Sequence, residues 1–187
     1  MAGNLDQLLV IDIEATCWQE GKSPPGQEPE IIEIGICVLD IPSGEPVETQ
    51  SILIKPEYSE ITPFCTELTA LTPAKLERGV TFDHACQILR RKYRSRSRVW
   101  ASYGDFDRRQ FKKQCQNRDI LYPFGPTHIN VKYLFAMMYG LPHEVGMLRA
   151  LELSALTPEG RHHSGVDDAL NTAVLLSRLL MQRRTVL

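Results

Sequence analysis

Two carboxylates near the end of an early apolar run have the spacing of a metal site. The run is LLVIDIEATC, residues 8–17. Because a strand alternates faces with period two, Asp12 and Glu14 fall on the same face, about 7 Å apart along the backbone. Burying two unpaired carboxylates is costly, and Mg²⁺ or Mn²⁺ binds such oxygens. The run therefore predicts half of a metal site, and the alternative is that both acids end the strand in solvent.

A second pair of acids follows a predicted strand-to-helix turn. Residues 98–103, RVWASY, have the pattern of a short strand, and Gly104 after them permits a turn. Asp105 is placed to cap the helix predicted for residues 105–117, whereas Asp107 falls in its first turn. Capping alone would explain both acids, and it explains Asp105 better. Asp107 is therefore the candidate metal ligand of this turn.

A third group, RHHSGVDD at residues 161–168, begins the last predicted helix, residues 165–184. Ser164 and Asp167 have the spacing of a capping box, which gives Asp167 a structural role. Asp168 lies about 100° further around the helix and is free to bind metal. His163 is a candidate proton acceptor, although single histidines often have surface or core roles. Consecutive residues of an extended loop point in opposite directions, so we expect His162 to face away.

The elements that must position these groups follow an α/β pattern. Strands are predicted for residues 30–40 and 49–55, and short connections join them to the first strand as an antiparallel meander. The long crossover before residues 98–103 predicts parallel pairing with the first strand. Sites in such sheets lie beyond the carboxyl ends of parallel strands, so the first two groups of acids share one edge. Further helices are predicted for residues 82–93, 131–139 and 147–153, and Thr81 can cap the first of them. Thr62 and Thr72, each followed by proline, have the pattern of N-caps of two helical segments before it.

Length and charge limit the class of protein. The chain has 187 residues and a net charge of −2, which suits one domain covering residues 1–187. No apolar run approaches the roughly 18 residues of a membrane span, and the N-terminus lacks the basic and apolar segments of a signal peptide. The charge is unlike that of a non-specific nucleic-acid binder, so any polyanionic substrate must be held by local groups or by metal.

The cysteines predict the compartment. There are five, Cys17, Cys37, Cys65, Cys86 and Cys115, and none forms a Cys-x-x-Cys pair. Their odd number and wide spacing argue against a disulfide framework or a zinc ribbon. We expect reduced thiols in a cytoplasmic protein.

A basic run at residues 90–98, RRKYRSRSR, resembles a nucleic-acid patch. It precedes the strand at residues 98–103 and so lies at the amino end of that strand, away from the edge with the acids. A solvated face or a partner surface is favoured over a second nucleic-acid contact.

Taken together, the three groups resemble the DEDDh 3′-to-5′ exonucleases of the ribonuclease H-like fold. The pattern is Asp12-x-Glu14, then Phe106-Asp107, then His163 with Asp168 five residues later. The chain is most similar to the branch with the eukaryotic histone-mRNA 3′ exonuclease and the bacterial KapD proteins. The pointers are EATC (14–17), FC (64–65) with LT (68–69), INVK (129–132), RAL (149–151) and GR (160–161). The SAP domain of the eukaryotic enzyme has no counterpart here, so its RNA docking is not carried over.

The resemblance implies a three-layer fold, with a mixed central sheet of about five strands flanked by helices. It implies that Asp12, Glu14, Asp107 and Asp168 hold two Mg²⁺ or Mn²⁺ ions and that His163 takes the proton of the attacking water. Glu14, Ala15 and His163 would contact the 3′-terminal nucleotide. The implied reaction releases 5′-nucleoside monophosphates from single-stranded RNA 3′ ends. Single-stranded DNA as the main substrate and a non-enzymatic nucleic-acid-binding domain remain alternatives.

Overall fold

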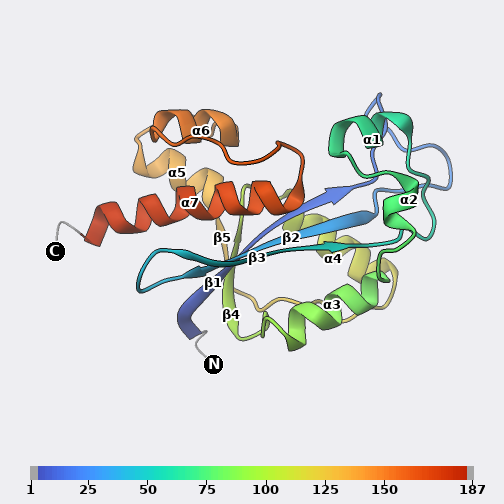
Figure 1. Cartoon of the computed structure of the whole chain (residues 1–187), viewed down its shortest axis with the longest axis horizontal. Helices are drawn as coiled ribbons and strands as arrows, with labels where there is room; N and C mark the ends of the chain where they lie inside the picture. The colour runs from blue at the N-terminus through green and yellow to red at the C-terminus, as the bar shows by residue number, and fades with distance from the viewer. Residues whose placement is uncertain (1–3, 185–187) are drawn as a thin grey trace.

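A mixed five-stranded sheet forms the centre of the computed structural model, which describes residues 4–184 (Figure 1). The strand order is β3-β2-β1-β4-β5. β1 pairs antiparallel with β2, as β2 does with β3, while β4 runs parallel to both β1 and β5. The predicted meander and the predicted parallel crossover are both confirmed. The strands are β1 (Asn4–Ala15), β2 (Ile31–Asp40), β3 (Pro46–Leu53), β4 (Arg98–Ser102) and β5 (His128–Asn130).

Helices cover both faces of the sheet and one end of it (Figure 1). Alternate residues of β1 explain the three layers: Leu9 and Ile11 pack with α3 and α4, whereas Leu8 and Val10 pack with α5, α6 and α7. Asp12 and Glu14 continue the second set, so they face the α7 layer. The helices are α1 (Pro63–Thr69), α2 (Pro73–Leu76), α3 (Phe82–Arg91), α4 (Phe106–Asn117), α5 (Val131–Met138), α6 (Met147–Leu153) and α7 (Gly165–Arg184).

Threonine caps start the first three helices, as the sequence predicts. The hydroxyl oxygens of Thr62, Thr72 and Thr81 accept from the backbone N–H groups three residues later, at 3.0, 3.2 and 3.2 Å. In α1 and α2 a proline occupies the first turn, where its missing N–H costs no hydrogen bond. Local sequence is therefore sufficient to fix where these helices begin.

Strand boundaries differ from the predicted ones. β1 begins four residues before the predicted residue 8 and ends at Ala15, where its register with β2 shifts. β3 covers residues 46–53 rather than 49–55. The position of β5 was not predicted, because its three half-buried residues are too few to show a periodic pattern. The predicted count of about five strands is nevertheless confirmed.

The helices of residues 4–184 do not combine the length and the apolar character that crossing a bilayer requires.

Candidate active site

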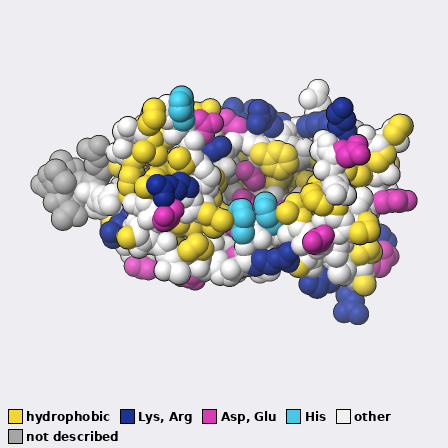
Figure 2. Space-filling model, turned by 90° about the horizontal axis from the view of Figure 1, so that it is seen from above, with side chains coloured by type: hydrophobic (Ala, Val, Ile, Leu, Met, Phe, Trp, Pro, Cys, Tyr) yellow, Lys and Arg dark blue, Asp and Glu magenta, His cyan; other side chains and the backbone are white. Residues whose placement is uncertain are grey.

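A cleft of about 340 Å³ opens where β1, α4 and α7 meet. Figure 2 shows acidic and histidine side chains gathered in a hollow of this face. Oxygen atoms of Asp12, Glu14 and Asp168 lie within 4.8 Å of one another. The cleft is lined by Asp12, Ile13, Glu14, Tyr103, Phe106, Asp107, Lys132, Gly146, Met147, His162, His163 and Asp168. The structure thus brings three of the four predicted ligands together and places the fourth, Asp107, in the same cleft.

Burial and mutual repulsion raise the pKa values of the β1 carboxyls. For Asp12, burial raises the pKa well above its ordinary value, and the charges of Asp107 and Asp168 add to the effect. Burial, then the charges of Asp168 and Glu33, raise the pKa of Glu14 to about 8. Such a cluster of acids is destabilised when all members are ionised, and it would be stabilised by a positive charge.

Asp107 links α4 to β1 directly. Its side chain is 4% exposed, and Oδ1 accepts from the backbone N–H of Ile13 at 3.0 Å. Burial raises the pKa of Asp107 to about 6, although the N–H donors around it act in the opposite direction. The carboxyl therefore stays beside Asp12, where the sequence predicts a ligand.

A close approach between β2 and the start of α7 positions Asp168. A Cβ atom on Gly35 would lie 1.9 Å from the backbone of Gly165, so only glycine fits there. Beside it, Glu33 Oε2 accepts from the Gly165 N–H at 3.0 Å, and Oε1 accepts from the Ser51 hydroxyl at 2.5 Å. A carboxylate at a helix N-terminus interacts favourably with the helix dipole. Sequence reasoning missed Glu33, although an acid inside the apolar strand at residues 31–39 is the same signal that identified Asp12 and Glu14.

The two histidines both line the cleft, which corrects the prediction that His162 faces away. Their rings are stacked, with centroids 4.0 Å apart. His163 has φ +63°, so the segment is a turn and the alternation of an extended chain does not apply. The ring of His162 contacts Asp168, with Nδ1 3.1 Å from Oδ2, while His163 donates its backbone N–H to the same oxygen at 2.9 Å.

Two predicted caps are wrong in detail. Asp105 occupies the N-cap position of α4, but its side chain makes no capping hydrogen bond. Asp167 does have a structural role, but its Oδ2 accepts from the backbone N–H of Arg161 at 2.9 Å and not from that of Ser164, as a capping box requires. For both Asp105 and Asp167, the path of the backbone before the helix decides which N–H groups the carboxylate can reach.

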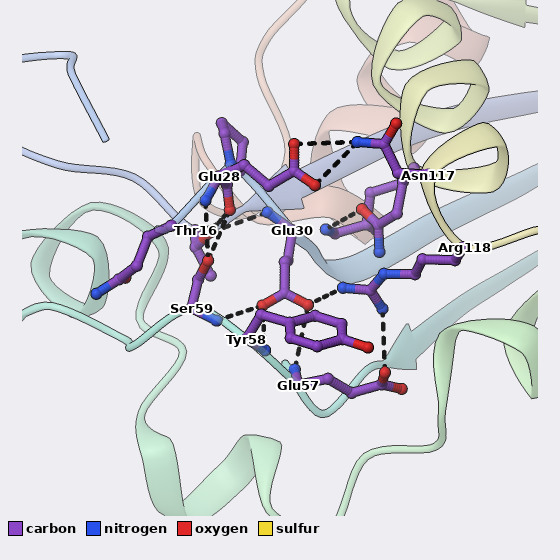
Figure 3. A network of polar contacts seen from close by, with 12 residues as sticks. Thr16, Glu28, Glu30, Glu57, Tyr58, Ser59, Asn117 and Arg118 are labelled. Atoms are coloured by element: carbon purple, nitrogen blue, oxygen red, sulfur yellow. Dashed lines mark hydrogen bonds and ion pairs between the residues drawn. The ribbon is translucent and has the colours of Figure 1, made fainter. Parts of the chain in front are cut away.

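A second cavity, of about 260 Å³, adjoins the cleft at the end of β1. Its lining includes Glu14, Ala15, Cys17, Leu68 and Phe106. Of the two predicted contact residues, Glu14 lines both cavities, whereas Ala15 lines the second one. The segment after Ala15 is fixed by paired hydrogen bonds. Thr16 donates its N–H to the Glu30 carbonyl at 2.8 Å, and its hydroxyl accepts from the Glu30 N–H at 2.9 Å (Figure 3).

The basic run at residues 90–98 contributes no residue to the lining of the cleft. Arg90 donates to the Leu121 carbonyl at 2.7 Å, Lys92 pairs with Glu48 at 2.7 Å and Arg98 pairs with Asp6 at 3.2 Å. Half of its six cations therefore tie α3 and β4 to their neighbours.

The residues of the cleft fit a divalent cation. Hard cations prefer carboxylate oxygens, and three such oxygens lie within 4.8 Å beside a fourth buried carboxylate. Raised pKa values are the expected signature of such a cluster when no cation balances it.

Comparison with known proteins identifies a family for this chain. A family model described as Exonuclease (RNase_T) matches residues 9–176. Human 3′-5′ exoribonuclease 1 is 30% identical, over 94% of this chain and 52% of that protein. The probable 3′-5′ exonuclease KapD of Bacillus subtilis is 29% identical, over 97% of this chain and 88% of that protein. The chain spans 28% of human ERI1 exoribonuclease 2 and about half of exoribonuclease 1.

The solved structures confirm the predicted ribonuclease H-like architecture. The nuclease domain of 3′hExo, described as a DEDDh family member bound to rAMP, superimposes with a TM-score of 0.86 and 27% identity, covering 97% of this chain and 95% of that one. With a family model that spans almost the whole chain, a shared fold and the predicted acids in one cleft, this chain belongs to the exonuclease (RNase_T) family.

Proposed function

We propose that residues 1–187 form a single metal-dependent 3′-to-5′ exonuclease unit that releases 5′-nucleoside monophosphates from single-stranded RNA. One observation carries the proposal: acids from β1, α4 and α7, far apart in the sequence, converge in one cleft. Because the three segments span residues 12 to 168, the cleft exists only when the whole domain is folded. The names of the relatives, which are exoribonucleases and a probable exonuclease, support the reaction class.

In this proposal, two Mg²⁺ or Mn²⁺ ions are held by four carboxylates, those of Asp12, Glu14, Asp107 and Asp168. When bound, the ions supply positive charge that stabilises the developing charge on the scissile phosphate and lowers the pKa of the attacking water. The chain itself contributes little cationic charge inside the cleft. Its acids are therefore best understood as a metal-binding set rather than as general acids.

The remaining residues bind the substrate end and move a proton. Glu14 and the backbone of Ala15 face the adjoining cavity of about 260 Å³, which receives the 3′-terminal nucleoside. His163 contacts this end and accepts a proton from the water that attacks phosphorus. The bond between phosphorus and the 3′ oxygen of the preceding nucleotide then breaks, leaving a new 3′-hydroxyl and a free 5′-nucleoside monophosphate.

The free cysteines support a cytoplasmic location. All five are unpaired, and four of them are buried. Unpaired thiols are stable in a reducing compartment.

A time course with end-labelled oligonucleotides tests the proposal. RNA and DNA, single- and double-stranded, are incubated with Mg²⁺ or Mn²⁺ and then with EDTA, with Asp12→Asn as the inactive control. We expect stepwise shortening of single-stranded RNA from the 3′ end, 5′-monophosphate products and no cleavage in EDTA. Cleavage of a circular substrate, full activity in EDTA or binding without cleavage would contradict it. Faster shortening of DNA than of RNA would contradict the proposed RNA substrate but not the proposed reaction.

A further inference from the structure

The acidic cleft contains one lysine. Of its lining residues, all within the described part of the chain, Lys132 is the single lysine or arginine. Lys132 is the second residue of α5, and the helix start is fixed by Asn130, whose Oδ1 accepts from the Tyr133 N–H at 3.2 Å. The lysine is thus held by a capped helix beside the strand-to-helix turn that carries Asp107.

The ammonium of Lys132 is only weakly engaged. Its Nζ lies 3.9 Å from Glu144 Oε1, at the limit of an ion pair, and the two side chains are 33% and 38% exposed. By contrast, Lys92 and Lys113 approach their glutamates to 2.7 and 3.0 Å. Exposed pairs of this kind contribute about 0–1 kcal/mol. Lys132 can therefore exchange Glu144 for another anion at little cost.

The two cavities define a direction through the site. The cavity assigned to the 3′-terminal nucleoside lies toward α1, with Cys17 and Leu68 in its lining. The other end of the cleft is bordered by Lys132, Gly146 and Met147, from α5 and the start of α6. Figure 1 shows α1 on one side of the N-terminal end of α7, and α5 and α6 on the other. In a single-stranded nucleic acid whose 3′ end points toward α1, the nucleotides on the 5′ side of the carboxylates therefore pass Lys132.

We propose that Lys132 binds the phosphate immediately 5′ of the scissile phosphate and that Glu144 competes with this phosphate for the ammonium. The inference rests on the proposed function, which places the 3′ end. The bound cations would neutralise the scissile phosphate, but the next phosphate approaches the same acidic cleft and needs a positive partner of its own. Lys132 is the residue placed to supply it.

The two members of the pair give opposite expectations. Lys132→Gln should raise the Kd and KM for an oligoribonucleotide by about 3- to 10-fold, the range for one partly exposed charged contact. Glu144→Gln should lower both, because the competing anion is gone. If the pair served only to hold α5, both substitutions would break it and would change binding in the same direction.

Salt dependence supplies a readout that a structural role would not change. Loss of one phosphate contact should reduce the slope of log Kd against log salt by about 0.7 for a single strand. Binding is measured by fluorescence anisotropy with a labelled oligoribonucleotide and Ca²⁺. Lys113→Gln is the matched control, because it removes a lysine of a surface Lys–Glu pair outside the cleft. Its slope should equal that of the wild type.

Hydrolysis locates the contact. The 5′-p-nitrophenyl ester of thymidine monophosphate has no upstream phosphate, so Lys132→Gln should lower kcat/KM for the oligonucleotide more than for this ester. An unchanged slope in Lys132→Gln, weaker binding in Glu144→Gln or equal losses on both substrates would overturn the proposal. A wild type that binds but does not cleave would contradict the proposed function alone, since the binding comparison still decides the role of Lys132. A wild type that does not bind would overturn both.

Discussion

Two buried glutamates of this chain have opposite surroundings. Glu30, 1% exposed, is surrounded by donors (Figure 3). Its carboxylate accepts from the backbone N–H groups of Glu57, Tyr58 and Ser59, at 3.1, 2.8 and 2.5 Å, and pairs with the guanidinium of Arg118. One side chain thereby joins the loop before α1 to the end of α4.

Glu14, 8% exposed, is surrounded mainly by other acids. Burial, then the charges of Asp168, Glu33 and Asp107, raise its pKa, and Arg161 is the weaker opposing charge. The cost of burying a glutamate carboxylate is thus compensated at Glu30, by hydrogen-bond donors and Arg118, but not at Glu14. An uncompensated buried charge is retained where it serves function, so the comparison separates the structural network from the candidate active site.

The largest expected effect is on turnover, at the first turn of α7. Asp168→Asn should reduce the rate at saturating Mn²⁺ by at least about 10³-fold, because metal contributes several kcal/mol to such transition states. Asp167→Asn should keep most of the activity, since an amide oxygen can still accept from the Arg161 N–H. Single-turnover cleavage of labelled RNA measures both. An inactive Asp167→Asn would contradict the assignment of Asp168 as a metal ligand and Asp167 as a structural acid.

A somewhat smaller loss is expected at the adjacent histidines. His163→Ala should lower turnover by about 10²- to 10⁴-fold, the usual contribution of general acid–base catalysis, while metal binding is retained. His162→Ala should remain active, although its ring contacts Asp168 in the structure. Turnover and Mn²⁺ binding are measured for each variant. An inactive His162→Ala beside an active His163→Ala would assign the proton acceptor to His162.

Stability should respond in opposite directions at the two glutamates. Glu30→Ala leaves the buried Arg118 with only the more distant carboxylate of Glu57, at 3.6 Å, and should lower the free energy of unfolding by about 3–5 kcal/mol. Glu48→Ala, which removes the exposed partner of Lys92, is the control and should cost about 0–1 kcal/mol. Urea unfolding in EDTA measures these values.

In the same measurement at pH 7, Glu14→Gln should stabilise the metal-free protein. With its pKa raised to about 8, the Glu14 carboxyl is ionised in the unfolded chain but disfavoured as an anion in the fold, a cost that glutamine does not bear. It should also reduce the rise in Tm that Mn²⁺ causes in the wild type. A Glu14→Gln variant less stable than the wild type in EDTA would mean that Glu14 has structural partners comparable to those of Glu30.

The smallest effect is a pH dependence at His128, a half-buried group with a neutral partner. Its Nε2 lies 2.9 Å from the Ser102 hydroxyl, and burial, then the charge of Arg108, lowers its pKa to about 4. The unfolded chain, with a pKa near 6.5, binds the proton more readily. Stability from this group is therefore present above about pH 6.5 and lost as the pH falls toward 4. Urea midpoints at pH 7 and 5 should differ less in His128→Gln than in the wild type.

Features that depend on local geometry could be predicted from the amino-acid sequence. Period-two alternation placed Asp12 and Glu14 on one face of β1, and threonine caps located the starts of α1, α2 and α3. The predicted bounds of α6 and α7 are confirmed as well. The order of the acidic motifs along the chain was enough to indicate the family, which the comparisons confirm.

The way in which residues 161–168 face Asp12 and Glu14 could not be predicted from the sequence, because it depends on how distant segments pack. His163 has a φ of +63° and both histidines line the cleft, and no spacing in the sequence encodes that turn. Glu33 is 132 residues from the Gly165 N–H that it binds, and Lys132 joins the cleft through an unpredicted strand. Such contacts depend on the relative placement of packed layers, which local periodicity does not specify.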